Sequence, residues 1–312
     1  MGSLGGIDVS SKRVQLITER VGAVLAEERD QATDAFVKGK LKAPIPLDPA
    51  DLLVVSTDGG RVQTRHNDRA KRWKEDKVGV VYEATPTPEQ PDVEYHGPKP
   101  IMRTSVATME SWDALGDHLS AVAERRGYHH ARQKVFISDG AVGIRSVRER
   151  CFPDAAFILD WAHAAEHLHD CAVAIFGPGS KADRWYERQK QRLWNGQAKR
   201  LIAEIAKRSR RLGPPPESAP DNDPRRILAN NLKYFRTNRE GIDYPRFRKN
   251  GWPIGSGIIE SAIKQVSKRV KGSEKHWSIK GVEETLQVVT HLISEDDSWD
   301  DFWRRGPLAR VA

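Results

Sequence analysis

Three acidic residues that lie far apart in the chain, Asp58, Asp139 and Glu260, are the candidates for chemistry. Asp58 and Asp139 each follow an apolar run and precede a glycine, in VVSTDGG and VFISDGA. Such runs predict short buried strands, and a carboxylate at the end of a strand projects from the edge of the sheet. The glycine that follows permits a tight turn and the close approach of a ligand. Taken singly, an Asp-Gly pair is more typical of an ordinary turn.

The third carboxylate, Glu260, follows a break in the chain. The sequence WPIGSGIIE at 252–260 contains Gly-Ser-Gly, after which residues 258–270 predict a helix. Glu260 lies in the first turn, where the helix dipole favours a negative charge, so a glutamate that only stabilises its own helix is the competing interpretation. Together the three carboxylates would offer hard oxygen ligands to Mg²⁺ or Mn²⁺. Without a cation, their mutual repulsion should raise their pKa values.

Asp160 competes with Asp139 for the second position. It also follows an apolar run, at 155–159, and it forms a D-x-x-H pair with His163. Both aspartates fit the pattern of a strand followed by a carboxylate, so the residues alone leave the choice open. His163 by itself is equally typical of a histidine that packs against a helix or caps it.

The elements that must position these side chains are read from hydrophobic periodicity. The predicted strands are 52–57, 61–63, 78–83, 134–138 and 155–159, with 101–106 as a short strand or the start of a helix. The predicted helices are 10–30, 110–126, 141–150 and 258–270, and the chain from 161 onward is mostly helical apart from a Pro-rich linker at 213–224. Three antiparallel strands followed by two strands reached through helices predict an α/β protein with a ribonuclease-H-like mixed sheet, a helical insertion and C-terminal helices.

Charge is distributed unevenly along the 312 residues. The formal net charge is +8, and residues 181–211 alone contain 11 Lys and Arg against 3 Asp and Glu. Residues 225–249 and 264–280 are also basic. Basic charge concentrated in the second half fits a polyanionic partner such as nucleic acid, while a solvated helix face explains the charge equally well.

Composition disfavours several other classes. No apolar run approaches the roughly 20 residues needed to cross a bilayer, and there is no secretory signal pattern, so we expect a cytoplasmic, nucleoid-associated protein without a membrane partner. The two cysteines, Cys151 and Cys171, are too few for a disulfide framework or a four-cysteine zinc site. Neither a Walker-type nor a GxGxxG loop occurs, which disfavours a kinase or a dehydrogenase.

Six segments resemble, in order, the bacterial insertion-sequence transposases of the DDE type, specifically the IS-Kra group, which is similar in layout to the Mutator-like transposases. The segments are STDGGRV (56–62), FISDGAVGIRSV (136–147), FPDAAFILDWAHAAEHL (152–168), WPIGSGIIESAIKQVSKRVKG (252–272), HWSIKGVEETL (276–286) and WDDFW (299–303). Together they span most of residues 50–303. By this resemblance Asp58, Asp139 and Glu260 match the three catalytic acidic residues.

The resemblance implies metal-dependent DNA strand cleavage and strand transfer, with Mg²⁺ or Mn²⁺ as the cofactor. Two divalent ions about 3.5–4 Å apart can stabilise the attacking and leaving oxygens of such a reaction. We expect Asp58 to bridge the two ions, with Asp139 on one and Glu260 on the other. Asp160 and His163 match an accessory motif that lies downstream of the second catalytic aspartate in Mutator-like relatives, which favours Asp139 as the metal ligand.

The resemblance also divides the chain. Residues 1–45 would be an N-terminal helical segment, the remnant of a DNA-binding region, and 46–163 the first part of the ribonuclease-H-like core. Residues 164–250 would be a helical insertion that grips the transposon end, and 251–312 the catalytic helix with the closing helices. The residues expected to contact DNA are Lys264, Lys268, Arg269 and Lys271 at phosphates, and Trp185 and Trp194 at unpaired bases. The competing interpretation, that at least one tryptophan is a core residue, is favoured for Trp194, which falls near one helical face with Leu201 and Ile205.

Three interpretations of the activity stay open. The leading one is an active transposase that works as a homo-oligomer on transposon ends and target DNA. The second is a truncated or domesticated transposase that binds DNA without cutting it, because the chain begins after the position of the family's N-terminal DNA-binding region. The third is a nuclease of the ribonuclease-H-like kind, which would release nicked products and never joined ones.

Overall fold

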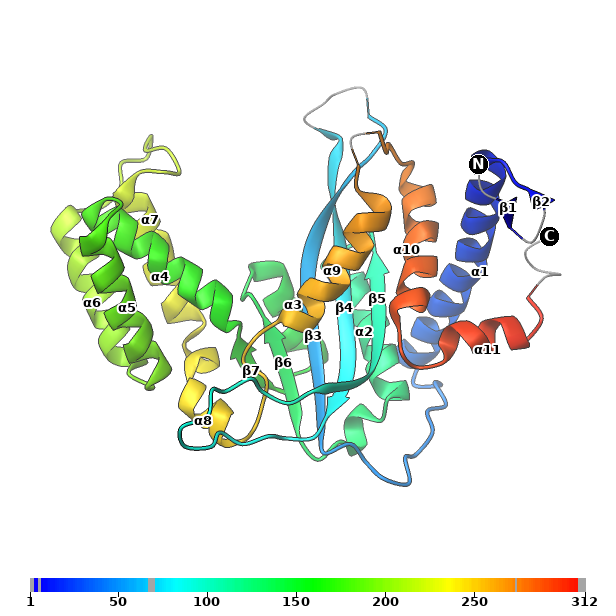
Figure 1. Cartoon of the computed structure of the whole chain (residues 1–312), viewed down its shortest axis with the longest axis horizontal. Coiled ribbons are helices and arrows are strands. Elements are labelled where there is room, and N and C mark those ends of the chain that lie inside the picture. Colours follow the sequence, from blue (N-terminus) through cyan, green and yellow to red (C-terminus); the bar gives the residue numbers. More distant parts are fainter. Residues whose placement is uncertain (1–2, 5–6, 67–70, 273, 308–312) are drawn as a thin grey trace.

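A five-stranded mixed sheet lies at the centre of the computed structural model, which describes residues 3–4, 7–66, 71–272 and 274–307 (Figure 1). The strand order is β5-β4-β3-β6-β7. The strands are β3 (Leu52–Gln63), β4 (Trp73–Ala84), β5 (Pro100–Thr108), β6 (Lys134–Ser138) and β7 (Ala156–Leu159). β3, β4 and β5 pair antiparallel, whereas β6 joins β3 in parallel and β7 joins β6 in parallel. This order and these directions confirm the predicted ribonuclease-H-like sheet.

β3 is longer than predicted, which corrects the interpretation of Asp-Gly-Gly as a turn. The strand runs through Asp58 without interruption, and residues 61–63 are its far end and not a separate strand. Gly60 faces Asp76 of β4, and a Cβ at Gly60 would lie 2.6 Å from both carboxylate oxygens of Asp76. The glycine therefore makes room for a side chain of the neighbouring strand, which a reading of local sequence could not reveal.

Helices surround the sheet. They are α1 (Ser11–Val37), α2 (Trp112–Arg125), α3 (Val142–Cys151), α4 (Trp161–Phe176), α5 (Ser180–Trp194), α6 (Ala198–Leu212), α7 (Pro224–Thr237), α8 (Tyr244–Lys249), α9 (Gly257–Val270), α10 (Ile279–Ile293) and α11 (Ser298–Arg304). Two 3-10 turns, η2 (Tyr128–His130) and η3 (Arg239–Ile242), lie between them. In the described part of the chain, none of the helices combines the length and apolar character needed to span a membrane.

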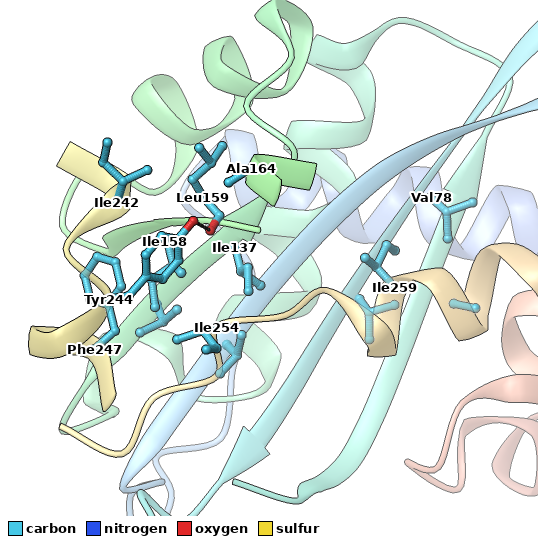
Figure 2. Packing of buried hydrophobic residues seen from close by; sticks show 14 of the residues in the cluster. Val78, Ile137, Ile158, Leu159, Ala164, Ile242, Tyr244, Phe247, Ile254 and Ile259 are labelled. Atoms are coloured by element: carbon cyan, nitrogen blue, oxygen red, sulfur yellow. Dashed lines mark hydrogen bonds between the residues drawn. The ribbon is translucent and has the colours of Figure 1, made fainter. Parts of the chain in front are cut away.

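The two faces of the sheet are covered by different helices. Helices α2 and α3 bury a cluster on one face that includes Leu53 of β3. Helix α9 lies across β3 and β4 on the other face, where Ile259 joins the same buried cluster as Val78 (Figure 2). Since successive side chains of a strand point to opposite faces, Asp58 belongs to the face that α9 covers.

The N-terminal helix α1 packs along α10 and against α2, at one side of the sheet (Figure 1). Ser10 caps α1 by accepting a hydrogen bond of 3.3 Å from the amide of Arg13. The helix buries Val21 and Leu25 in a cluster with side chains of α10 and α11. A short hairpin, β1 (Ser3–Leu4) and β2 (Ile7–Asp8), precedes it. Helix α1 thus packs on the helices that flank the sheet.

A group of helices, α4 to α8, lies at the opposite side of the sheet (Figure 1). α4 packs against α5 and α7, and α6 packs against α7. The group reaches the sheet through η3, which contacts β7, and through α8, where the Tyr244 hydroxyl donates a hydrogen bond of 3.0 Å to the Leu159 carbonyl (Figure 2). The segment 164–250, predicted as a helical insertion, is thus mostly helical and anchored at the end of β7.

Candidate active site

The parallel registers of the sheet align three aspartates. Ser56 pairs with Ile137, so the register aligns Asp58 on β3 with Asp139, which directly follows the end of β6. The register between β6 and β7 aligns Asp139 with Asp160 in the same way. Neighbouring strands are about 4.8 Å apart. The fold therefore brings the first two predicted site residues together, although they are distant in the sequence.

The pKa of the Asp58 carboxyl is shifted by burial and by the neighbouring site residues. Its pKa is raised to about 6, chiefly by burial, and the amide of Gly59, which donates to its Oδ1 at 2.7 Å, opposes that shift. The charges of Asp139 and Glu260 contribute to the increase, whereas His163 opposes it. All three side chains are therefore close enough for their charges to act on Asp58.

Asp139 lies in the loop between β6 and α3 and is held at two points. Its Oδ1 accepts a hydrogen bond of 2.8 Å from the amide of Ala141. Its carbonyl accepts a hydrogen bond of 2.8 Å from the hydroxyl of Tyr234 in α7. The side chain is half-buried, so part of the carboxylate is accessible to solvent while two hydrogen bonds hold the residue in place. Tyr234 escaped the sequence analysis because its role depends on a contact between segments 95 residues apart.

Glu260 lies in the first turn of α9, as predicted. Its Oε2 is 3.5 Å from Nζ of Lys264, and its Oε1 accepts a hydrogen bond of 3.4 Å from the Ser256 hydroxyl. The side chain is 39% exposed, so it can change rotamer without disturbing the core. In this arrangement the Glu260 carboxylate contacts Lys264 and Ser256, both within one turn of the helix. Its charge raises the pKa of Asp58.

Asp160 has a different environment, which distinguishes it from Asp139. It is fully buried, its Oδ1 accepts a hydrogen bond of 2.7 Å from the amide of His163, and its Oδ2 accepts one of 2.5 Å from the amide of Ser256. Main-chain donors thus engage both oxygens, at the start of α4 and just before α9. The imidazole of His163 lies 3.4 Å from Glu166, on the next turn of α4. This geometry makes Asp160 a helix cap and favours Asp139 as the second acidic candidate.

The acidic residues have the donor chemistry of a Mg²⁺ or Mn²⁺ site, but their side chains do not converge as they stand. Within the ranges that the structure describes, no group of three or more His, Cys, Asp and Glu side chains is arranged to hold a metal ion. Asp58 and Asp139 occupy aligned positions, and their oxygens suit hard cations. Glu260 is directed toward Lys264 and would have to turn to Asp58 to join them.

The two tryptophans predicted to stack on DNA bases are packing residues in this structure. Trp185 is 2% exposed in the core of the helical group, which corrects the prediction for this residue. Trp194 is half-buried. Its ring meets Trp161 edge-on, with 5.0 Å between the ring centroids, and the Arg248 guanidinium lies 3.8 Å from the centroid of the Trp194 ring. A base could stack on either ring only after these contacts had opened.

Most of the basic residues of α9 and its C-terminal end are exposed to solvent. Lys264, Lys268 and Arg269 are exposed, and Lys271 at the C-terminal end is half-buried. The helix therefore carries exposed positive charge from the turn after Glu260 to its C-terminal end.

A buried carboxylate that the sequence analysis did not single out, Asp76, lies on the same face of the sheet as Asp58. It is fully buried, and neither of its oxygens has a hydrogen-bond partner in another described residue. Burial raises its pKa, an effect that the charges of Lys271 and Lys77 oppose. No local pattern marks this residue, because its environment depends on Gly60 of the neighbouring strand β3.

Comparisons with known proteins give distant likenesses among solved structures. No protein-family model matches the chain, and no curated protein matches it. Among solved structures, the chain is similar to a chain of the Drosophila P element transposase strand transfer complex, with 10% sequence identity, 94% of each chain covered and a TM-score of 0.34. A likeness this distant identifies neither the site nor the reaction, so both rest on the geometry of this chain.

Proposed function

We propose that the chain is the catalytic unit of a metal-dependent DNA transposase, which cleaves DNA strands and joins them to a target. The observation that carries the proposal is the environment of Asp58. Burial and the charges of Asp139 and Glu260 raise its pKa to about 6. The three carboxylates come from a strand, from the end of the neighbouring parallel strand and from the first turn of a helix, on a ribonuclease-H-like sheet.

Each carboxylate has its own task in this proposal. Divalent cations such as Mg²⁺ or Mn²⁺ supply the positive charge that stabilises the attacking and leaving oxygens of a phosphodiester. Asp58, on which the charges of the other two act, would hold the shared position. Asp139 would hold one side, with its carboxylate oriented by the amide of Ala141. Glu260 would hold the other side after leaving Lys264.

The partner in this proposal is DNA, bound through its phosphates. Phosphate contacts from Lys and Arg supply most of the affinity of such proteins and make it dependent on salt. The exposed residues Lys264, Lys268 and Arg269 lie on the helix that carries Glu260, so DNA held there would pass close to the carboxylates. The basic residues of 181–211 extend the positive charge over α5 and α6.

A cleavage and joining assay with the purified chain tests the proposal. The substrates are a labelled linear duplex and a supercoiled plasmid, with Mg²⁺ or Mn²⁺. We expect cut and joined products from the wild type, and loss of both in Asp58→Asn, Asp139→Asn and Glu260→Gln. Asp51→Asn is the matched control, because Asp51 directly precedes β3 at the end opposite to Gln63 and pairs with Arg132. Full activity of any of the three variants would remove that residue from the site.

A protein that binds DNA without cutting it is the second candidate. The pairing of Glu260 with Lys264 favours it, because this pairing holds the third carboxylate away from a shared metal position. Such a protein would retard the duplex in a gel and yield no products with either metal. A nuclease without strand transfer would instead release nicked plasmid and no joined DNA.

A further inference from the structure

The loop that carries Asp139 is held by side chains of the helical group. The Tyr234 hydroxyl in α7 donates a hydrogen bond of 2.8 Å to the Asp139 carbonyl. Asn238, directly after α7, is 2% exposed, and its Oδ1 accepts a hydrogen bond of 3.2 Å from the Arg145 guanidinium in α3. The helical group thus contacts both the residue proposed as a metal ligand and the helix that follows it.

Gly140 permits the close approach of these parts. It has a φ of +78°, and a Cβ there would lie 2.7 Å from Nδ2 of Asn238 and 2.8 Å from the Leu159 side chain. Any residue other than glycine would strain the backbone and push Asn238 away. The loop after β6 is therefore shaped to fit against the end of α7.

Tyr234 is itself fixed by packing within the helical group. Its ring stacks on the imidazole of His167 in α4, with 3.7 Å between centroids and 26° between planes. Nδ1 of His167 lies 2.6 Å from Oδ1 of Asn231, one turn before Tyr234 in α7. Burial, with the charges of Asp139 and other nearby carboxylates, raises the pKa of Tyr234, so its hydroxyl keeps its proton and remains a donor. A shift of α4 against α7 would therefore move the donor that holds Asp139.

We propose that Tyr234 is a positioning residue for Asp139, through which the packing of α4 and α7 sets the geometry of the acidic site. The inference rests on the proposed function in one respect, namely that the position of Asp139 matters for catalysis. The hydrogen bond of Tyr234 to Asp139 does not depend on that function, and this allows the two claims to be tested separately.

The test uses Tyr234→Phe, which removes the hydroxyl and keeps the ring that stacks on His167. The first measurement is the hydrogen exchange rate of the Ala141 amide, which reports directly on Asp139 because it donates to Oδ1. Loss of one hydrogen bond should raise this rate about 5–30-fold. The second measurement is DNA cleavage as a function of Mg²⁺ concentration. We expect the half-saturating Mg²⁺ concentration to rise several-fold, with KM for DNA unchanged.

Tyr128→Phe is the matched control. Its hydroxyl donates a hydrogen bond of 2.6 Å to Asp154, near the opposite end of β6, so its loss should leave both measurements at the wild-type values. The proposal is overturned if Tyr234→Phe exchanges at the wild-type rate, or if Tyr128→Phe changes both quantities as strongly. If the wild type cuts no DNA with any metal, the proposed function fails, while the exchange rate still decides the role of Tyr234.

Discussion

Asp160 and Ser256, 96 residues apart, are joined by a hydrogen bond of 2.5 Å from the Ser256 amide to Oδ2 of Asp160. The other oxygen of Asp160 caps α4, and the amide of Trp161 donates to the carbonyl of Ile254 at 2.9 Å. These bonds fix the segment before α9 to the end of β7. The helix that carries Glu260 therefore starts from a position set by Asp160.

Asp160→Ala is expected to lower the free energy of unfolding by about 2–4 kcal/mol, because it removes a helix cap and leaves a second buried amide without its charged acceptor. Urea denaturation at neutral pH measures this difference.

Asp139→Ala is the comparison for that experiment. It loses one hydrogen bond of a half-buried side chain, so we expect it to cost less than about 1 kcal/mol while abolishing cleavage. Equal stability of the Asp160 and Asp139 variants would show that Asp160 is not the structural member of the pair.

Asp58→Asn is expected to stabilise the protein at neutral pH. The pKa of Asp58 is raised from 3.8 to about 6, chiefly by burial. Below about pH 4 the carboxyl is protonated in both the folded and the unfolded chain, so ionisation favours neither. As the pH rises toward 6 the unfolded chain ionises first, and the wild type loses stability that the Asn variant keeps. Because Asp58 is partly exposed, we expect a gain of about 1–2 kcal/mol above pH 7.

Urea denaturation at pH 4 and pH 7.5 measures that gain. Asp51→Asn is the control, since it makes the same change from carboxylate to amide at a half-exposed side chain outside the acidic site. A difference between Asp58→Asn and the wild type that does not grow with pH would contradict the raised pKa. In the wild type, added Mn²⁺ should reduce the difference, because a cation at the carboxylate favours its charged form.

Gly60→Ala tests the contact between β3 and the buried carboxylate of Asp76. The new Cβ would lie 2.6 Å from both oxygens of Asp76, and a fully buried side chain has little room to move. We expect a loss of about 1–3 kcal/mol in the free energy of unfolding.

The same substitution in an Asp76→Ala background provides the control for that clash. There the added methyl has no carboxylate to meet, so we expect Gly60→Ala to cost less than about 0.5 kcal/mol beyond Asp76→Ala itself. An equal cost in both backgrounds would mean that the glycine serves the conformation of β3 and not the space for Asp76.

The sequence was sufficient where local pattern decides the structure. β6, β7 and the first turn of α9 at Glu260 follow from apolar runs and from the Gly-Ser-Gly break. The prediction of a turn at Asp-Gly-Gly is wrong because the second glycine, Gly60, makes room for the side chain of Asp76 on the neighbouring strand. The residues next to Gly60 in the sequence do not indicate this contact. Asp160 and Asp139 have the same local pattern, and the features that distinguish them, the complete burial of Asp160 and its hydrogen bond from the Ser256 amide, depend on tertiary structure.

Substitutions on α9 test whether this helix binds DNA phosphates. Each lysine or arginine that contacts a phosphate of duplex DNA contributes about 0.9 to the slope of log affinity against log salt. Lys268→Ala should therefore lower the magnitude of the slope by about 0.9, and Lys268→Ala with Arg269→Ala by about 2. Fluorescence anisotropy of a labelled duplex, measured over a range of salt concentrations, gives the slope.

Lys38→Ala is the control, because this exposed lysine follows α1, which α10 separates from α9 (Figure 1). If Lys268→Ala and the double variant both gave the slope of the wild type, the DNA would bind elsewhere on the protein. The helical segment 181–211 would then be the next surface to test.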